Sequence, residues 1–121
     1  MPNSVLIVDD SPLARKMVLR ALPAGWATEV RHAGNGVEAL AAYRAATPDA
    51  IFLDLNMPEL DGYQVLEALR GEPSLPPIVV LSGDIQPQAR ERVLALRARA
   101  FVKKPATAAV LEELLRSWGL L

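Results

Sequence analysis

The 121-residue sequence contains no cysteine and only one histidine, His32. The absence of cysteine excludes disulfides, zinc–thiolate sites and thiol catalysis, and a single histidine cannot form a histidine-based metal site. Charge of one sign is not in excess: 13 basic and 14 acidic side chains give a formal net charge of −1. This balance gives no electrostatic case for binding nucleic acid or an anionic membrane. No apolar run approaches the ~20 residues of a membrane span, and no signal peptide is recognisable. We therefore expect a cytoplasmic domain that binds neither nucleic acid nor membrane.

Apolar runs typical of strands alternate with segments of helical periodicity along the whole chain. The predicted strands are Val5–Val8, Thr28–His32, Ala50–Leu53, Ile78–Leu81 and Ala100–Lys103, and the predicted helices are Leu13–Leu22, Gly36–Ala46, Gly62–Arg70, Pro87–Arg97 and Thr107–Trp118. Strict alternation indicates an α/β fold, a doubly wound five-stranded parallel sheet with helices on both faces. No linker, repeat or low-complexity segment interrupts the pattern, so residues 1–121 are expected to form one domain.

The stretch VLIVDDSP at residues 5–12 places two adjacent acids at the end of the first strand. Ser11 followed by Pro12 predicts that a helix begins there, so Asp9 and Asp10 lie in a strand-to-helix turn. On these residues alone, one alternative is that Asp9 merely assists the helix cap and that both acids face water. The other is a functional site.

A third acid, Asp54, ends the predicted strand AIFLD. In open α/β sheets, ligands bind outside the carboxyl ends of strands where the strand order reverses. For the flavodoxin-like order 2-1-3-4-5, that reversal lies between the first and third strands, so Asp9, Asp10 and Asp54 should converge. At ~5 Å and an effective dielectric of about 20, each pair of carboxylates repels by roughly 3 kcal/mol. A counter-charge is therefore expected, and an all-oxygen site without histidine or cysteine suits Mg²⁺.

Two further polar residues should lie at the same edge of the sheet. Ser82 ends the fourth strand and Lys104 follows the fifth. With a metal, a hydroxyl donor and an ammonium are the groups needed to hold three phosphoryl oxygens while a carboxylate acts as nucleophile. Asp54 is the best candidate nucleophile because it stands alone at its strand end.

The ordered combination VDDS … FLDLNMPELDG … LSGD … FVKKP resembles the receiver domains of two-component response regulators, over essentially the whole chain. The resemblance implies that Asp54 is the phospho-acceptor. It also implies that Asp10, Asp54 and the backbone carbonyl of Asn56 coordinate Mg²⁺, with Asp9 acting through water. Asn56 and Asp84 would flank the path of the water that hydrolyses the phosphoryl group.

The resemblance also assigns roles around the fifth strand. Ser82 would bond the phosphoryl group, and Lys104 would contact it from a cis Lys104–Pro105 bond. Phe101 takes the place of a switch aromatic that is often Tyr in the family. Arg99 stands where the family commonly has a left-handed glycine after the fourth helix, so either Arg99 adopts a positive φ or the turn is remodelled.

The function implied is a phosphorylation-driven switch rather than a conventional enzyme. A sensor histidine kinase or phosphotransfer protein would supply the phosphoryl group, and the domain would catalyse only its own phosphorylation and dephosphorylation. The signal would pass through the face formed by the fourth helix, fifth strand and fifth helix to a downstream output domain or protein. No DNA-binding output is expected within these residues. The segments ALPAGW, SGDIQPQA and FVKKP resemble receivers attached to CheC-type phosphatase domains.

Two other functions fit part of this evidence. A phosphohydrolase of the haloacid-dehalogenase type also uses an Asp nucleophile, Mg²⁺, Lys and Ser/Thr, but its nucleophile lies in a D-x-D pattern where this chain has DDSP. A pseudo-receiver would bind partners without phosphorylation, which the complete set of site residues disfavours.

Overall fold

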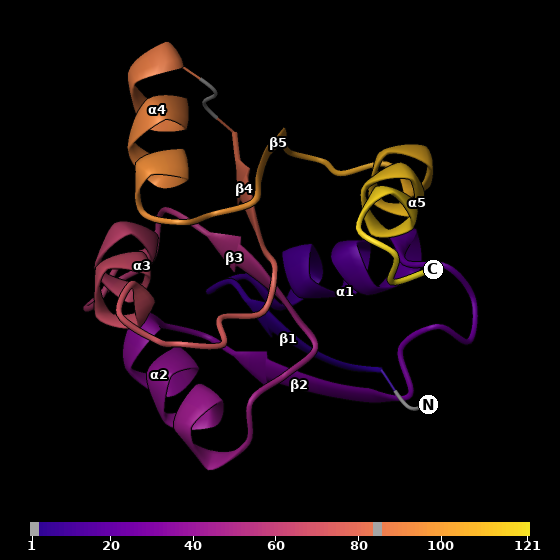
Figure 1. Ribbon diagram of the computed structural model, residues 1–121, viewed down its shortest axis with the longest axis horizontal. Coiled ribbons are helices and arrows are strands. Elements are labelled where there is room, and N and C mark those ends of the chain that lie inside the picture. The colour runs from indigo at the N-terminus through magenta and orange to yellow at the C-terminus, as the bar shows by residue number, and fades with distance from the viewer. Residues whose placement is uncertain (1–2, 84–85) are drawn as a thin grey trace.

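The computed structural model describes residues 3–83 and 86–121, and it contains the ten elements that the sequence predicts (Figure 1). In chain order they are β1 Ser4–Val8, α1 Pro12–Ala21, β2 Glu29–Ala33, α2 Gly36–Ala45, β3 Ala50–Asp54, α3 Gly62–Leu69, β4 Ile78–Ser82, α4 Pro87–Ala95, β5 Ala100–Lys103 and α5 Ala108–Ser117. The five strands are parallel and lie in the order β2-β1-β3-β4-β5. The doubly wound fold with strand order 2-1-3-4-5 is confirmed.

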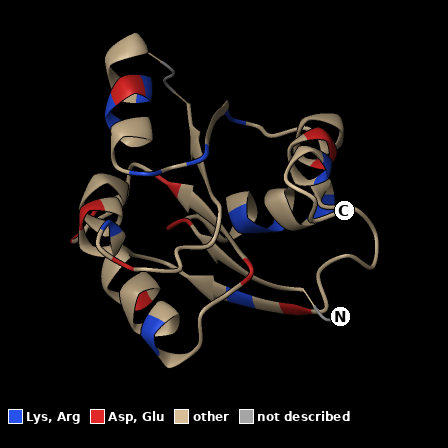
Figure 2. Cartoon of the chain, viewed as in Figure 1, with Lys and Arg blue, Asp and Glu red and all other residues tan. Residues whose placement is uncertain are grey.

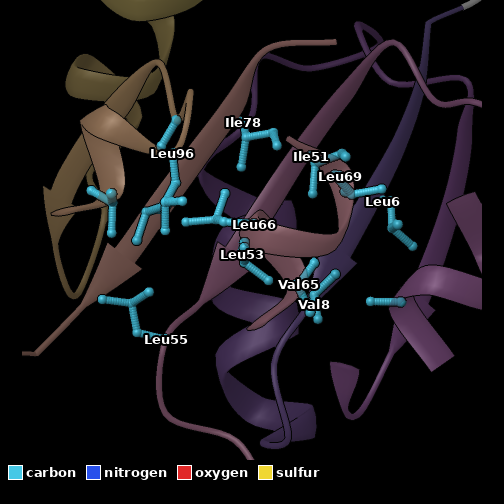
Figure 3. Packing of buried hydrophobic residues seen from close by; sticks show 14 of the residues in the cluster. Leu6, Val8, Ile51, Leu53, Leu55, Val65, Leu66, Leu69, Ile78 and Leu96 are labelled. Carbon is cyan, nitrogen blue, oxygen red and sulfur yellow. The ribbon is translucent and has the colours of Figure 1, made fainter. Parts of the chain in front are cut away.

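Helices cover both faces of the sheet, with α1 and α5 on one side and α2, α3 and α4 on the other (Figure 1). Successive strand residues point to opposite faces, which separates the apolar side chains into two cores. Figure 3 shows part of the larger core, where Leu6, Ile51 and Leu53 pack with Val65 and Leu66 of α3. In the part of the chain that the structure describes, no helix is long and apolar enough to cross a membrane.

The observed element ends differ from the predicted ones by no more than two residues, and hydrogen bonds explain where they lie. Helix α1 begins at Pro12 because the Ser11 side chain accepts a bond from the Ala14 N–H at 3.2 Å, as expected of an N-cap. Strand β2 extends to Ala33 because Ala33 pairs with Val8 of β1.

The turn after α4 follows the second of the two predicted alternatives, a remodelled turn. The left-handed residue is Arg97, with φ 74°, and not Arg99. The Ala98 N–H donates to the carbonyl of Val93 at 3.0 Å, which closes a Schellman motif around Arg97. The Arg99 N–H already donates to the carbonyl of Ile78 at 2.9 Å. The chain has therefore entered the sheet pairing at Arg99, and the remodelled turn lies two residues earlier.

The Arg97 side chain accounts for an arginine at a position that favours glycine. Its guanidinium donates to the carbonyls of Arg70 at 2.6 Å and Glu72 at 2.9 Å, at the end of α3. A left-handed residue with a Cβ costs roughly 1 kcal/mol, and each such hydrogen bond contributes about that much. Arg97 thus links the ends of α3 and α4 at little net cost in free energy.

Candidate functional site

Three acids converge where the strand order reverses, as predicted. Asp9 and Asp10 follow β1, and Asp54 ends the neighbouring strand β3. Each carboxylate offers one oxygen such that the three oxygens lie within 4.8 Å of one another. Figure 2 shows the acidic segments at the ends of β1 and β3 side by side. Asp9 and Asp54 are only 3% and 4% exposed, whereas Asp10 is open to solvent.

Asp9 is held by bonds to three different segments. Its N–H donates to the carbonyl of Ala33 at 3.0 Å. Its Oδ1 accepts a bond from the Ser11 N–H at 2.9 Å, and its Oδ2 accepts one from Lys104 Nζ at 2.6 Å. The capping alternative is therefore only partly right, because Asp9 does bind the start of α1 but is buried rather than facing water.

Lys104 supplies the counter-charge that the acid cluster requires. Its Nζ lies 2.6 Å from Asp9 Oδ2 and 2.9 Å from Asp54 Oδ1. The Lys104 N–H donates to the carbonyl of Ser82 at 2.9 Å, and the Lys104–Pro105 peptide bond is cis, as expected. Burial works to lower the pKa of Lys104, but the hydrogen bonds and charges of Asp9 and Asp54 outweigh it and raise that pKa. Lys104 therefore stays an ammonium at neutral pH.

The site disfavours the ionised form of Asp54. Burial raises the pKa of Asp54, and the like charge of Asp9 adds to that effect. The hydrogen bond and charge of Lys104 and the backbone N–H of Asn56 act in the opposite direction without cancelling it. The ionised carboxylate is thus less stabilised here than in water, and a phosphoryl group or a cation would relieve that cost.

Replacing Asp54 by Asn should stabilise the protein at neutral pH when divalent cations are absent. An acid whose pKa is raised in the folded state destabilises the fold when it ionises. This cost appears as the pH rises from 3.8, the ordinary pKa of Asp, through the higher pKa of the folded state. Asn cannot ionise, and its carbonyl oxygen can still accept the bond from Lys104. Urea unfolding with a chelator should show that the gain at about pH 7 disappears below about pH 3.5. A gain that persists unchanged in acid would point to packing instead.

Ser82 and Phe101 lie along the next two strands. Ser82 ends β4 at 2% exposure, one residue after Leu81, which pairs with Asp54. Phe101 on β5 pairs with Val80, and its ring is buried in the core shared with α3 and α4. Ser82 therefore lies at the end of the strand next to Asp54, and Phe101 lies on the strand beyond it.

Asn56 and Asp84 complete the residues predicted from the sequence. Asn56 is exposed two residues after Asp54, and its N–H binds the Asp54 carboxylate. Asp84 lies outside the described residues. Lys103, the other lysine of the KKP motif, is exposed, which is consistent with Lys104 being the lysine of the site.

Gly62 has no predicted role in the site, yet this glycine sets how closely α3 approaches β3. A Cβ on Gly62 would lie 2.5 Å from the Asp54 carbonyl oxygen and 2.7 Å from Leu55 Cα. The Gly62 N–H donates to the carbonyl of Leu55 at 3.0 Å, and a capping box between Asp61 and Gln64 begins the helix here. An Asp-Gly pair at the start of the helix that follows a buried strand could have indicated this close approach.

Gly62→Ala should destabilise the fold by about 3 kcal/mol, because neither of the atoms that its Cβ meets can move without shifting β3. Gly71→Ala is the matched control, since a Cβ on Gly71 meets nothing within 4 Å. Chemical unfolding of both variants checks the prediction. Equal stability of the two variants would contradict the close packing of α3 on β3.

The donors brought together here fit Mg²⁺. Carboxylate oxygens and backbone carbonyls are the ligands that this hard cation prefers, and an exposed carboxylate leaves room for the water that it retains. Asp9, Asp10 and Asp54 supply such oxygens, and the family resemblance adds the Asn56 carbonyl as a fourth candidate. The cluster contains no nitrogen or sulfur ligand that would favour zinc.

Comparisons with known proteins agree with this geometry. Residues 5–116 match the family model of the response regulator receiver domain. The chain is 40% identical over 104 residues to a protein-glutamate methylesterase/protein-glutamine glutaminase of Rhodospirillum rubrum, which covers 85% of this chain and 28% of that protein. It is 40% identical over 118 residues to the response regulator MprA of Mycobacterium tuberculosis, covering 95% of this chain and 48% of MprA.

Solved structures show the same fold. The chemotaxis response regulator CheY4 of Vibrio cholerae superposes with a TM-score of 0.84 at 31% identity, covering 100% of both chains. The chain spans between about a quarter and a half of the length of the curated relatives it matches. The match to the family model, the strand order and the converging acids lead to one conclusion: the chain belongs to the response regulator receiver domain family.

Proposed function

We propose that this receiver domain is switched by transfer of a phosphoryl group to Asp54, with Mg²⁺ held by Asp9, Asp10, Asp54 and the carbonyl of Asn56. The observation that supports this most directly is the setting of Asp54. Its carboxylate is buried, lies 2.9 Å from the Lys104 ammonium and has the other two acids within reach of one cation.

The proposed reaction forms a bond between an Asp54 carboxylate oxygen and phosphorus while the bond from phosphorus to the donor's leaving atom breaks. The donor is a sensor histidine kinase or phosphotransfer protein. Mg²⁺, when bound, offsets negative charge at the acids and the phosphoryl oxygens. Lys104 is placed to exchange its bond to Asp54 for one to a phosphoryl oxygen, and the Ser82 hydroxyl can donate to another.

The proposed output is a rearrangement of the α4–β5–α5 face. Phosphorylation brings about −1.5 to −2 charges and three acceptor oxygens to a buried site. Ser82 and the Phe101 ring link that site to β5. The domain acts as a regulator of a downstream output domain or protein in the cytoplasm, and its own chemistry is limited to gaining and losing the phosphoryl group.

Acetyl phosphate with Mg²⁺, followed by intact-mass measurement, tests the proposal. One phosphoryl group per chain should be added, and a chelator should prevent its addition. A domain that remains unmodified with saturating Mg²⁺ would support the pseudo-receiver alternative instead.

Asp10→Asn should weaken Mg²⁺ binding at least about tenfold, because it removes one of the few charged ligands of a partly hydrated ion. Titration of Mg²⁺ followed by the NMR shifts of the Asp10 and Asn56 amides measures this affinity. Glu59→Gln is the matched control, since it removes the same charge from an exposed residue of the β3–α3 loop. If Asp10→Asn binds Mg²⁺ as tightly as the control, the ligand set is wrong.

A further inference from the structure

Arg15 on α1 contacts the backbone of the acid pair rather than either carboxylate. Its Nη1 donates to the carbonyl oxygen of Asp9 at 2.5 Å, and the side chain is half-buried. The same nitrogen lies 3.8 Å from where a Cβ on Gly34 would be, so the guanidinium sits between the β1–α1 and β2–α2 turns. The Arg15 side chain is thus held in one place, although Arg15 has no part in the metal or phosphoryl site described above.

The contact completes the restraint of Asp9. The N–H of Asp9 is held by Ala33 and its two carboxylate oxygens by Ser11 and Lys104. The carbonyl is the remaining polar group of this residue, and Arg15 holds it. All four polar groups of Asp9 therefore have a protein partner.

The Asp9 carbonyl belongs to the peptide plane that leads into Asp10. A peptide unit is planar, so fixing the direction of this carbonyl also fixes the Asp9–Asp10 amide and limits where the Asp10 Cα–Cβ bond can point. The Asp10 side chain itself is exposed and has no hydrogen bond or ion pair within residues 3–83 and 86–121. Its aim toward Asp9 and Asp54 therefore depends on the backbone.

We propose that Arg15 is a positioning residue for the metal site, holding the Asp9–Asp10 peptide so that the Asp10 carboxylate faces Asp54. This inference rests on the proposed Mg²⁺ site. It assigns the role to the hydrogen bond of Arg15 and not to its charge, because a positive charge near the site by itself opposes cation binding.

The two possible roles of Arg15 therefore predict opposite changes in Mg²⁺ affinity when Arg15 is removed. If Arg15 acted only through its charge, removing it would tighten Mg²⁺ binding. If it positions Asp10, removing it weakens binding in spite of the lost repulsion. Lys16 offers a matched comparison, since it is the next residue of α1, is exposed, and its side chain makes no ion pair or hydrogen bond with any described residue.

The experiment compares Mg²⁺ dissociation constants of the wild type, Arg15→Met, Lys16→Met and Arg15→Lys, measured from amide shifts at constant ionic strength. Arg15→Met should bind roughly tenfold more weakly, the usual cost of losing a group that orients a metal ligand. Lys16→Met should bind as tightly as the wild type or more tightly. Arg15→Lys keeps the charge but has a single donor nitrogen, so it should fall between the wild type and Arg15→Met.

Wild-type-like or tighter binding by Arg15→Met overturns this inference alone, and leaves the metal site intact. Absence of Mg²⁺ binding by the wild type overturns the metal site, and this inference with it. Circular dichroism checks that each variant is folded. If Arg15→Met does not fold, Arg15→Lys decides: weaker binding supports the positioning role, and unchanged binding overturns it.

Discussion

The Asp54→Asn variant is expected to gain no phosphoryl group from acetyl phosphate and Mg²⁺. The amide of Asn is far less nucleophilic than a carboxylate, and the neighbouring acids are poorly suited to replace it. The Ser11 N–H and Lys104 hold the two oxygens of Asp9 toward the start of α1 and toward the lysine. Asp10 is exposed and lacks the contact with Lys104 that Asp54 has.

Intact-mass spectra of the wild type and Asp54→Asn, recorded under identical conditions, measure this effect. Glu59→Gln serves as the control because it removes an exposed acid near the site and should be phosphorylated like the wild type. Circular dichroism should show that Asp54→Asn is folded, in keeping with the stability gain expected above. Stoichiometric phosphorylation of another acid in this variant would overturn the assignment of Asp54.

Ser82→Ala is expected to accept the phosphoryl group at Asp54 but to transmit little of the change to β5. To make a pre-existing active state at ~1% dominant, phosphorylation must favour it by roughly 5 kcal/mol. One charge-assisted hydrogen bond contributes only about 1.5–3 kcal/mol of this. The bond from Ser82 is thus a large but incomplete share, and Lys104 and the metal must supply the rest.

The buried ring of Phe101 provides the route from Ser82 to the surface. If the Ser82 hydroxyl moves toward the phosphoryl group, it vacates volume beside β5, which the ring can fill. Close-packed cores move between discrete arrangements rather than deforming smoothly, so a shift of this ring repacks its neighbours. The same core contains Val93 of α4 and Leu96, the residue that caps this helix.

NMR amide shifts on phosphorylation test this coupling. Wild-type amides around Phe101, Arg90–Arg97 and Val110–Leu114 should shift, and those of Ser82→Ala should shift much less. Ser74→Ala is the control, because Ser74 is exposed in the segment before β4 and its shifts should match those of the wild type. Equal shifts in Ser82→Ala and the wild type would mean that the signal leaves the site by another route.

Local patterns in the sequence determined the fold and which acids meet at its edge. Hydrophobic periodicity and turn residues act over a few positions, so they located the ten elements to within two residues. Parallel strands bring their carboxyl ends to one edge, so the placement of Asp9, Asp10, Asp54, Ser82 and Lys104 followed from the order of the strands. The cis Lys104–Pro105 bond also agrees with expectation, but it was inferred from the family resemblance.

Only the tertiary structure decided how those residues contact one another. Lys104 bonds to Asp9, 95 positions away in the chain, and no local pattern encodes such a distance. The left-handed turn lies at Arg97 rather than Arg99, because sheet pairing begins at Arg99 and the Arg97 side chain reaches carbonyls beyond α3. The positions of Arg15 and Gly62 could not be predicted from the sequence for the same reason. Each lies against backbone atoms whose positions are set by the packing of other elements. Residue type and spacing determine which groups meet at an edge of the sheet, but the bonds between them depend on distances that exist only after the helices have packed.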